Sequence, residues 1–226
     1  MGWFVLGSSN RPHESKDPLV RRYLIEFIGT FFLVLTVCFA VQTGSALAPL
    51  GIGAILAAMI FAGGHISGAH YNPAVTTAVL LRGRLPLSDV PGYLIAQFAG
   101  GLLAAAISRY VFSSAAAFHV SGRALVAAFL VELLFTFALA FVVLNVATSR
   151  SHANNSFYGL AIGFTVLAGV VAVGAVSGGV FNPAVALGGS VAGLLSWSML
   201  PVYLVANLGG GALAGVVFNA LNPGDA

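Results

Sequence analysis

The chain has 226 residues, of which 59% are hydrophobic and only 7% are charged, and its mean hydropathy is +0.99. A soluble domain of this composition would have too little polar surface to cover itself, so the composition indicates an integral membrane protein. The formal net charge of +3 comes from basic residues in loops and near the N-terminus, and it does not indicate a nucleic-acid partner.

Two uncharged stretches are each long enough to hold several membrane spans. No Asp, Glu, Lys or Arg occurs at positions 27–81 or 151–224, whereas one span needs about 20 apolar residues. Residues 1–22 predict a cytoplasmic tail, and residues 23–226 a single channel domain. The predicted spans are 23–42, 50–63, 91–111, 125–147, 157–176 and 199–219.

Two further segments are helical in pattern but too short to cross the bilayer. Each follows an irregular, glycine-containing segment: 64–71 precedes a helix at 72–81, and 177–181 precedes one at about 182–195. Ten residues at about 1.5 Å each cover roughly half of a 30 Å hydrocarbon core. These segments therefore predict half-helices that leave the membrane on the side from which they entered.

Each half-helix begins with the same three residues, Asn72-Pro73-Ala74 in the first and Asn182-Pro183-Ala184 in the second. Asn is a preferred N-cap because its side-chain oxygen accepts from free backbone N–H groups, and Pro suits the first helical position. A helix that begins inside the bilayer must face other protein or a cavity. The motif therefore predicts a polar site within the membrane.

The second half of the chain repeats the first. Asn72 and Asn182 lie 110 residues apart, and Ser67-Gly68 recurs as Ser177-Gly178 at the same offset. Glu26 recurs as Glu132. The repeats, about 23–111 and 124–220, each contain three spans, so the second must enter from the opposite side. We therefore expect an all-α membrane protein with six transmembrane helices, two re-entrant half-helices and an inverted repeat.

The basic residues predict the orientation. With the N-terminus inside, most of them are cytoplasmic and only Arg109 and Arg123 lie outside, as the positive-inside rule requires. Both termini are then cytoplasmic, and a cell membrane is the simplest location. The predicted cytoplasmic residues are Arg11, Lys16, Arg21, Arg22, Arg82, Arg84 and Arg150.

Two helix N-termini that face one point create a positive potential there, roughly half a charge each. The amides of Asn72 and Asn182 add N–H donors. Cations and protons would meet a barrier, whereas a neutral solute with an oxygen acceptor would not.

The remaining ionisable residues do not indicate catalysis. Glu26 and Glu132 could relay protons, but we favour carboxylates that accept backbone N–H bonds from the irregular segments. His65 and His70 lack the Cys or acidic partners of a metal site. His119 and His152 lie in connectors and could sense pH, although an exposed loop histidine is the default interpretation. No nucleophile, base and orienting group occur together in the spans, so we expect neither an enzyme nor a cofactor.

Taken together, the paired Asn-Pro-Ala motifs, the Gly64-His65-Ile66-Ser67-Gly68 segment and the repeated glutamates resemble the aquaporin, or major intrinsic protein, family over essentially the whole chain. The resemblance implies a homotetramer with one pore in each subunit. It also implies passive conduction of water or small neutral solutes, with protons excluded at Asn72 and Asn182.

The sequence departs from this family at the outer filter. Water-selective members place an aromatic residue, a His, a small residue and an Arg at the positions that correspond here to Ile52, Val170, Gly179 and Val185. A filter without ring or charge should be wider and less polar. We therefore expect conduction of glycerol, urea, ammonia and metalloid acids such as arsenous acid (arsenite), together with water. Glycerol-facilitating members commonly carry Asp where this chain has Ala186, so an ordinary glycerol facilitator is not expected.

Three alternatives stay open at this point. The first is a mainly water-selective aquaporin. The second is a coupled secondary transporter, a class that also uses inverted repeats and broken helices, although the shortage of intramembrane acids speaks against it. The third is a junctional or structural membrane protein with little flux.

Overall fold

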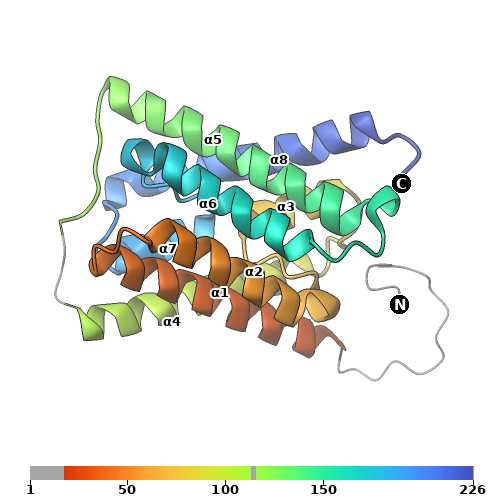
Figure 1. Cartoon of the computed structure of the whole chain (residues 1–226), viewed down its shortest axis with the longest axis horizontal. Helices are drawn as coiled ribbons and strands as arrows, with labels where there is room; N and C mark the ends of the chain where they lie inside the picture. Colours follow the sequence, from red (N-terminus) through yellow and green to blue (C-terminus); the bar gives the residue numbers. More distant parts are fainter. Residues whose placement is uncertain (1–17, 113–115, 226) are drawn as a thin grey trace.

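The computed structural model describes residues 18–112 and 116–225, which form a bundle of helices (Figure 1). Six helices in this part of the chain are long and apolar enough to cross a membrane, as predicted. They are α1 (Pro18–Gln42), α2 (Ala48–Ser67), α4 (Val90–Val111), α5 (Arg123–Val143), α6 (Tyr158–Ser177) and α8 (Leu200–Leu221). The half-helices are α3 (Pro73–Leu81) and α7 (Pro183–Val191), and single turns form η1 (Leu144–Thr148), η2 (Arg150–His152) and η3 (Trp197–Met199).

The start of the bundle corrects two predicted boundaries. Helix α1 begins at Pro18, so the end of the predicted tail 1–22 is helical, and residues 1–17 lie outside the described residues. Helix α2 continues to Ser67, because Gly68 ends it in the left-handed conformation, at φ 89°, with its N–H bonded to the Gly64 carbonyl. The first irregular segment is therefore shorter than predicted.

The second half-helix is also shorter than predicted. Helix α7 ends at Val191 instead of continuing to 195. The cause is Gly193, which turns the chain at φ 80°. The N–H groups of Leu194 and Leu195 then bond back to the Gly189 carbonyl, at 2.8 and 3.2 Å. A glycine just after the last helical residues is the usual signal for this ending.

The two repeats run in opposite directions. Helices α1 and α5 are antiparallel in Figure 1, and the start of α1 lies at the same end of the bundle as the end of α8. The helix contacts repeat in pairs: α1 packs on α4 as α5 packs on α8, and α2 meets its counterpart α6. We call the opposite end, where α4 ends and α5 begins, the connector end.

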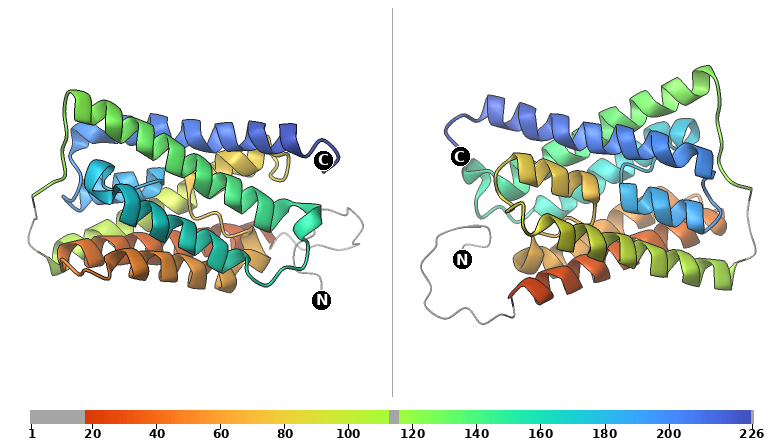
Figure 2. Two further views of the ribbon diagram at one scale, coloured as in Figure 1. Left: turned by 45° about the horizontal axis from the view of Figure 1, so that its top comes forward. Right: turned by 180° about the vertical axis from the view of Figure 1, so that it is seen from behind.

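Each half-helix packs against the other repeat. Helix α3 contacts α8, and α7 contacts α4; the two lie end to end across the bundle in the right-hand view of Figure 2. Glycine permits both contacts. A Cβ on Gly101 would lie 3.0 Å from the Ala184 carbonyl oxygen, and one on Gly211 would overlap that of Ala74. The repeats are thus interlocked and not merely adjacent.

Asp225 joins three connections at the end of the bundle where α1 begins. Its carboxylate lies 3.0 Å from the Arg82 guanidinium and 3.7 Å from that of Arg84, and it accepts the backbone N–H of Arg150. Burial alone would raise the pKa of this carboxyl. The Ser149 hydroxyl, the Arg150 N–H and the two arginine charges outweigh that effect and lower the pKa.

Candidate functional site

The two irregular segments have the same backbone conformation. Gly68 and Gly178 have φ of 89° and 92°, and Tyr71 and Phe181 have φ of 50° and 49°. A positive φ is unfavourable for bulky residues such as Tyr and Phe, so surrounding contacts must hold it. In both segments a buried glutamate makes those contacts.

Glu26, on α1, accepts four hydrogen bonds. One oxygen accepts from the Ser67 hydroxyl at 2.6 Å and the His70 N–H at 2.9 Å. The other accepts from the Tyr71 N–H at 2.7 Å and the Gln97 amide at 2.9 Å. The backbone hydrogen bonds expected of this residue are therefore present.

Glu132, on α5, repeats this arrangement. Its first oxygen accepts from the Ser177 hydroxyl at 2.7 Å and the Val180 N–H at 2.8 Å. Its second accepts from the Phe181 N–H at 2.8 Å and the Asn207 amide at 2.9 Å. Four donors compensate for the burial of a carboxylate inside the protein. Both glutamates are fully buried, so they hold the segments without bordering the cavity.

The two motif asparagines act as N-caps. The side-chain oxygen of Asn72 accepts the Ala74 N–H at 2.8 Å, and that of Asn182 accepts the Ala184 N–H at 2.9 Å. Because the oxygens cap the helices, the amide nitrogens point away from them. The two helix starts and their four amide N–H groups therefore converge on the middle of the bundle.

The amide nitrogens also bond across the repeats. Asn72 donates to the Phe181 carbonyl and Asn182 to the Tyr71 carbonyl, both at 2.9 Å. Each amide has two N–H groups, and these bonds use one of them. The second N–H of each asparagine is not used in these bonds, and both asparagines border the cavity described next.

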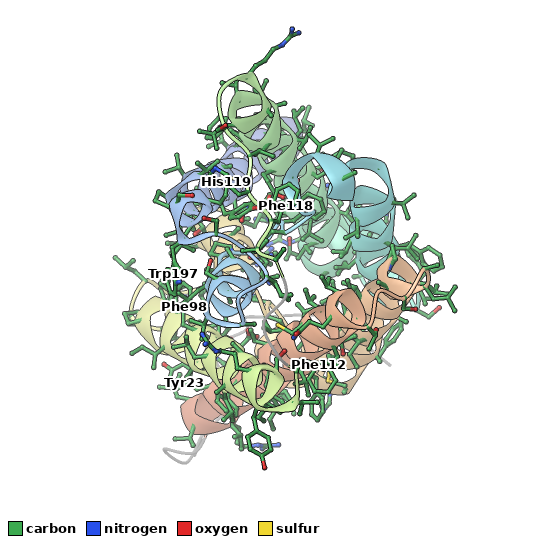
Figure 3. All side chains as sticks on the ribbon, turned by 90° about the vertical axis from the view of Figure 1, so that its left-hand side faces the viewer. Tyr23, Phe98, Phe112, Phe118, His119 and Trp197 are labelled. Carbon is green, nitrogen blue, oxygen red and sulfur yellow. The ribbon has the colours of Figure 1, made fainter. Side chains whose placement is uncertain are left out.

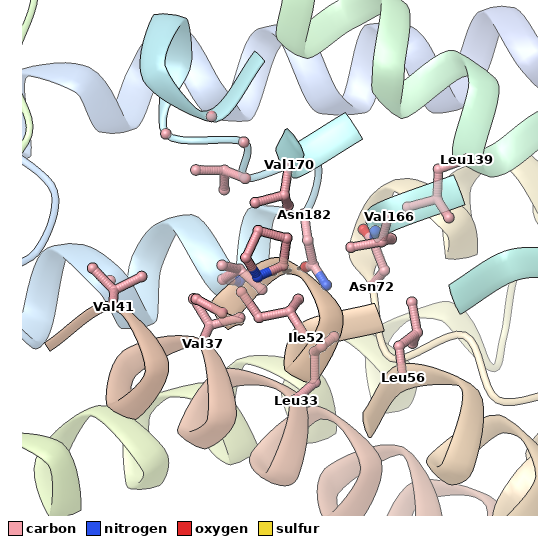
Figure 4. A pocket seen from close by; sticks show the side chains of 18 of the residues that line it. Leu33, Val37, Val41, Ile52, Leu56, Asn72, Leu139, Val166, Val170 and Asn182 are labelled. Carbon is pink, nitrogen blue, oxygen red and sulfur yellow. Dashed lines mark hydrogen bonds between the residues drawn. The ribbon is translucent and has the colours of Figure 1, made fainter. Parts of the chain in front are cut away.

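A cavity of about 310 Å³ extends along the repeat interface past both asparagines (Figure 4). All four positions expected at the outer filter border it: Ile52, Val170, Gly179 and Val185. Among the described residues that border it, polar side chains come only from His70, Asn72 and Asn182. The wall is otherwise apolar.

His70 borders the cavity, a role that the sequence analysis did not assign. It is buried, with Nδ1 3.1 Å from the Thr76 hydroxyl, whereas His65 is exposed. The two histidines therefore do not converge on a shared site, and the described residues contain no cluster of three or more metal-ligating side chains. His119 and His152 are exposed and bond to Ser198 and to the Asn145 carbonyl.

Phe118 also borders the cavity, and nothing in the sequence predicts this position for it. It lies in the connector between α4 and α5, where no periodic pattern or motif marks it. Its backbone pairs with the segment that follows α7, so tertiary contacts alone bring it to the cavity.

Comparisons with known proteins agree on one family. The family model described as major intrinsic protein matches residues 13–218. Glycerol uptake facilitator protein-like 6 of Lactiplantibacillus plantarum is 39% identical over 86% of this chain and 95% of its own length. Aquaporin NIP1-2 of Arabidopsis thaliana is 36% identical over 89% of this chain and 74% of its own. The structure of the aquaglyceroporin from Plasmodium falciparum has the same fold, with a TM-score of 0.75 at 23% identity over 89% of this chain and 96% of its own.

Proposed function

Because the chain belongs to the major intrinsic protein family, whose members are passive membrane channels and not enzymes, we propose that it conducts small neutral solutes together with water. The proposed solutes are glycerol, urea, ammonia and undissociated metalloid acids such as arsenous acid. The observation that carries this proposal is the composition of the wall at Ile52, Val170, Gly179 and Val185, which supplies neither ring nor charge. A wide wall without charge admits solutes larger than water, and a weakly polar solute loses little hydration in passing it.

The centre of the cavity supports selection for neutral species. The N-termini of α3 and α7 place roughly half a positive charge each beside Asn72 and Asn182. The free amide N–H groups can donate to a hydroxyl or carbonyl oxygen, but they offer nothing to a cation. A proton or metal ion would therefore lose its hydration without compensation, both here and along the apolar wall.

We further propose that the protein is a homotetramer with one pore in each subunit, in a cell membrane, with both termini in the cytoplasm. In this orientation the connector end is the outer end. Ile95, Val171 and Val205 are between 63% and 69% exposed, which suits contact with lipid or a neighbouring subunit. Native mass spectrometry in detergent tests the proposed stoichiometry, and a monomer with full flux would contradict it.

Stopped-flow light scattering on proteoliposomes tests the solute range. Glycerol and urea permeabilities should exceed those of empty liposomes, and an uptake assay should detect arsenite. High water permeability with solute rates at the empty-liposome level would refute the broad range and favour the mainly water-selective alternative.

Val185→Arg tests whether this wall sets the selectivity. A long cation at this position should lower flux of glycerol and larger solutes more than flux of water, because it narrows the cavity while its N–H donors can still hydrogen-bond to passing water. Val185→Leu adds bulk without charge and is the matched control. Equal loss of water and solute flux in Val185→Arg would show that this position does not select between them.

A further inference from the structure

The connector between the repeats brings an aromatic ring to the cavity. Phe118 supplies the only phenyl ring among the described residues that border it. Figure 3 looks onto the connector end of the bundle, where Phe118 and His119 project from the connector. The four filter positions supply no ring, so Phe118 is chemically unlike the rest of the wall.

Three contacts fix this part of the connector to the segment after α7. The Phe118 N–H donates to the Leu194 carbonyl at 2.8 Å, and the Phe118 carbonyl accepts the Ser196 N–H at 3.0 Å. The His119 ring nitrogen lies 3.2 Å from the Ser198 hydroxyl. Two backbone bonds hold the main chain at Phe118, so the position of its ring does not depend on side-chain contacts alone.

The depth of the ring follows from α7. Val185 lies three residues beyond Asn182, and Gly189 lies seven beyond it, or about 4.5 and 10 Å at 1.5 Å per residue. Leu194 and Leu195 bond back to Gly189, and Phe118 pairs with them. The ring therefore lies nearer the connector end than Val185 does, so a solute entering from there meets it first.

We propose that Phe118 is a specificity-determining residue that sets the upper size limit for solutes at the connector end of the pore. This inference rests on the proposed solute channel and deepens it. A flat, rigid ring occupies space that the small and aliphatic filter residues leave open. Its face is apolar, so it offers no hydrogen bond to a polyol and acts through shape.

Phe118→Ala should admit longer solutes. In proteoliposomes, the permeability ratio of ribitol to glycerol should rise about tenfold, the lower end of what a small size change achieves in an apolar site. Phe112→Ala is the matched control, because Phe112 starts the same connector but packs on Phe39, with ring centroids 5.0 Å apart, and does not border the cavity. An equal ratio in both variants would overturn the proposal.

Phe118→Cys gives a second test that needs neither a wide pore nor solute flux. A methanethiosulfonate reagent added on the connector side should label the new thiol and reduce water flux at least by half. The wild-type chain is the control, since its Cys38 is buried. Labelling without loss of water flux, or failure to label, would overturn the proposal.

The two experiments separate this inference from the proposed function. If the wild type conducts water but no glycerol, the broad solute range is wrong, and block of water flux through Phe118→Cys still tests whether Phe118 lies in the conducting path, which the proposal requires. A residue that only anchors the connector would show equal loss of all fluxes in Phe118→Ala and no block after labelling.

Discussion

Replacing Glu132 by Gln should loosen the segment that leads into Asn182. The amide keeps one oxygen, which can still accept from Ser177 and the Val180 N–H. Its NH2 group replaces the oxygen that accepts the Phe181 N–H at 2.8 Å. Two donors then face each other, and the Phe181 N–H is left buried without an acceptor.

The size of the effect follows from these bonds. Asn207 also loses this acceptor, but its amide nitrogen still donates to the Thr136 hydroxyl at 2.9 Å and so keeps a partner. One unsatisfied buried donor remains, which costs about 1–3 kcal/mol. Local opening of residues 178–182 should therefore become about 5- to 150-fold more frequent.

Hydrogen exchange followed by mass spectrometry measures this opening. The peptide that contains residues 178–182 should exchange faster in Glu132→Gln, while the peptide with 68–72 stays unchanged. Glu26→Gln is the matched control, because Glu26 accepts the backbone N–H groups of His70 and Tyr71. In this variant the peptide with 68–72 should exchange faster and the peptide with 178–182 should stay unchanged. Unchanged exchange at 178–182 in Glu132→Gln would refute the assignment of Glu132 as the group that holds this segment.

Two further predictions concern the packing of the repeats. Gly211→Ala should lower the thermal stability in detergent, because its methyl would overlap the Ala74 carbonyl, whereas Gly209→Ala should not, since its nearest neighbour is 3.8 Å away. The pKa of Asp225 is lowered, so its ion pair with Arg82 contributes above the ordinary Asp range and is lost as pH falls through the folded pKa. Asp225→Asn should lower the melting temperature at pH 7, and its melting temperature should fall less than that of the wild type below about pH 4. A melting temperature that depends on pH as in the wild type would count against this.

Most of the architecture follows from the sequence because its signals are local or repeated. Uncharged stretches mark the spans, and Asn-Pro-Ala marks the start of each half-helix at Asn72 and Asn182. The predicted helix ends at 63 and 195 were wrong, because the helices end at Ser67 and Val191. Each end depends on which glycine adopts a left-handed conformation. A sequence alone does not reveal which of several neighbouring glycines does so.

The site was less predictable where it depends on contacts between distant segments. The bonds of Glu26 and Glu132 follow from a general need, because backbone N–H groups in a membrane require acceptors. Phe118 reaches the cavity only because its backbone pairs with residues 194–196, which lie 76 to 78 residues later in the chain. The roles of Val185 and of the other filter positions in selectivity stay predictions until flux is measured.

The bonds between the two asparagine motifs have a consequence for biosynthesis. Asn72 donates to a carbonyl 109 residues later, at Phe181, and α3 packs on α8, the last helix. When the first repeat leaves the ribosome, neither partner exists. The first half-helix therefore cannot reach its final position during synthesis of its own repeat. The centre of the pore is assembled only when nearly the whole chain is in the membrane. Truncation before α8 should leave the first half-helix without its packing partner and accessible to proteases.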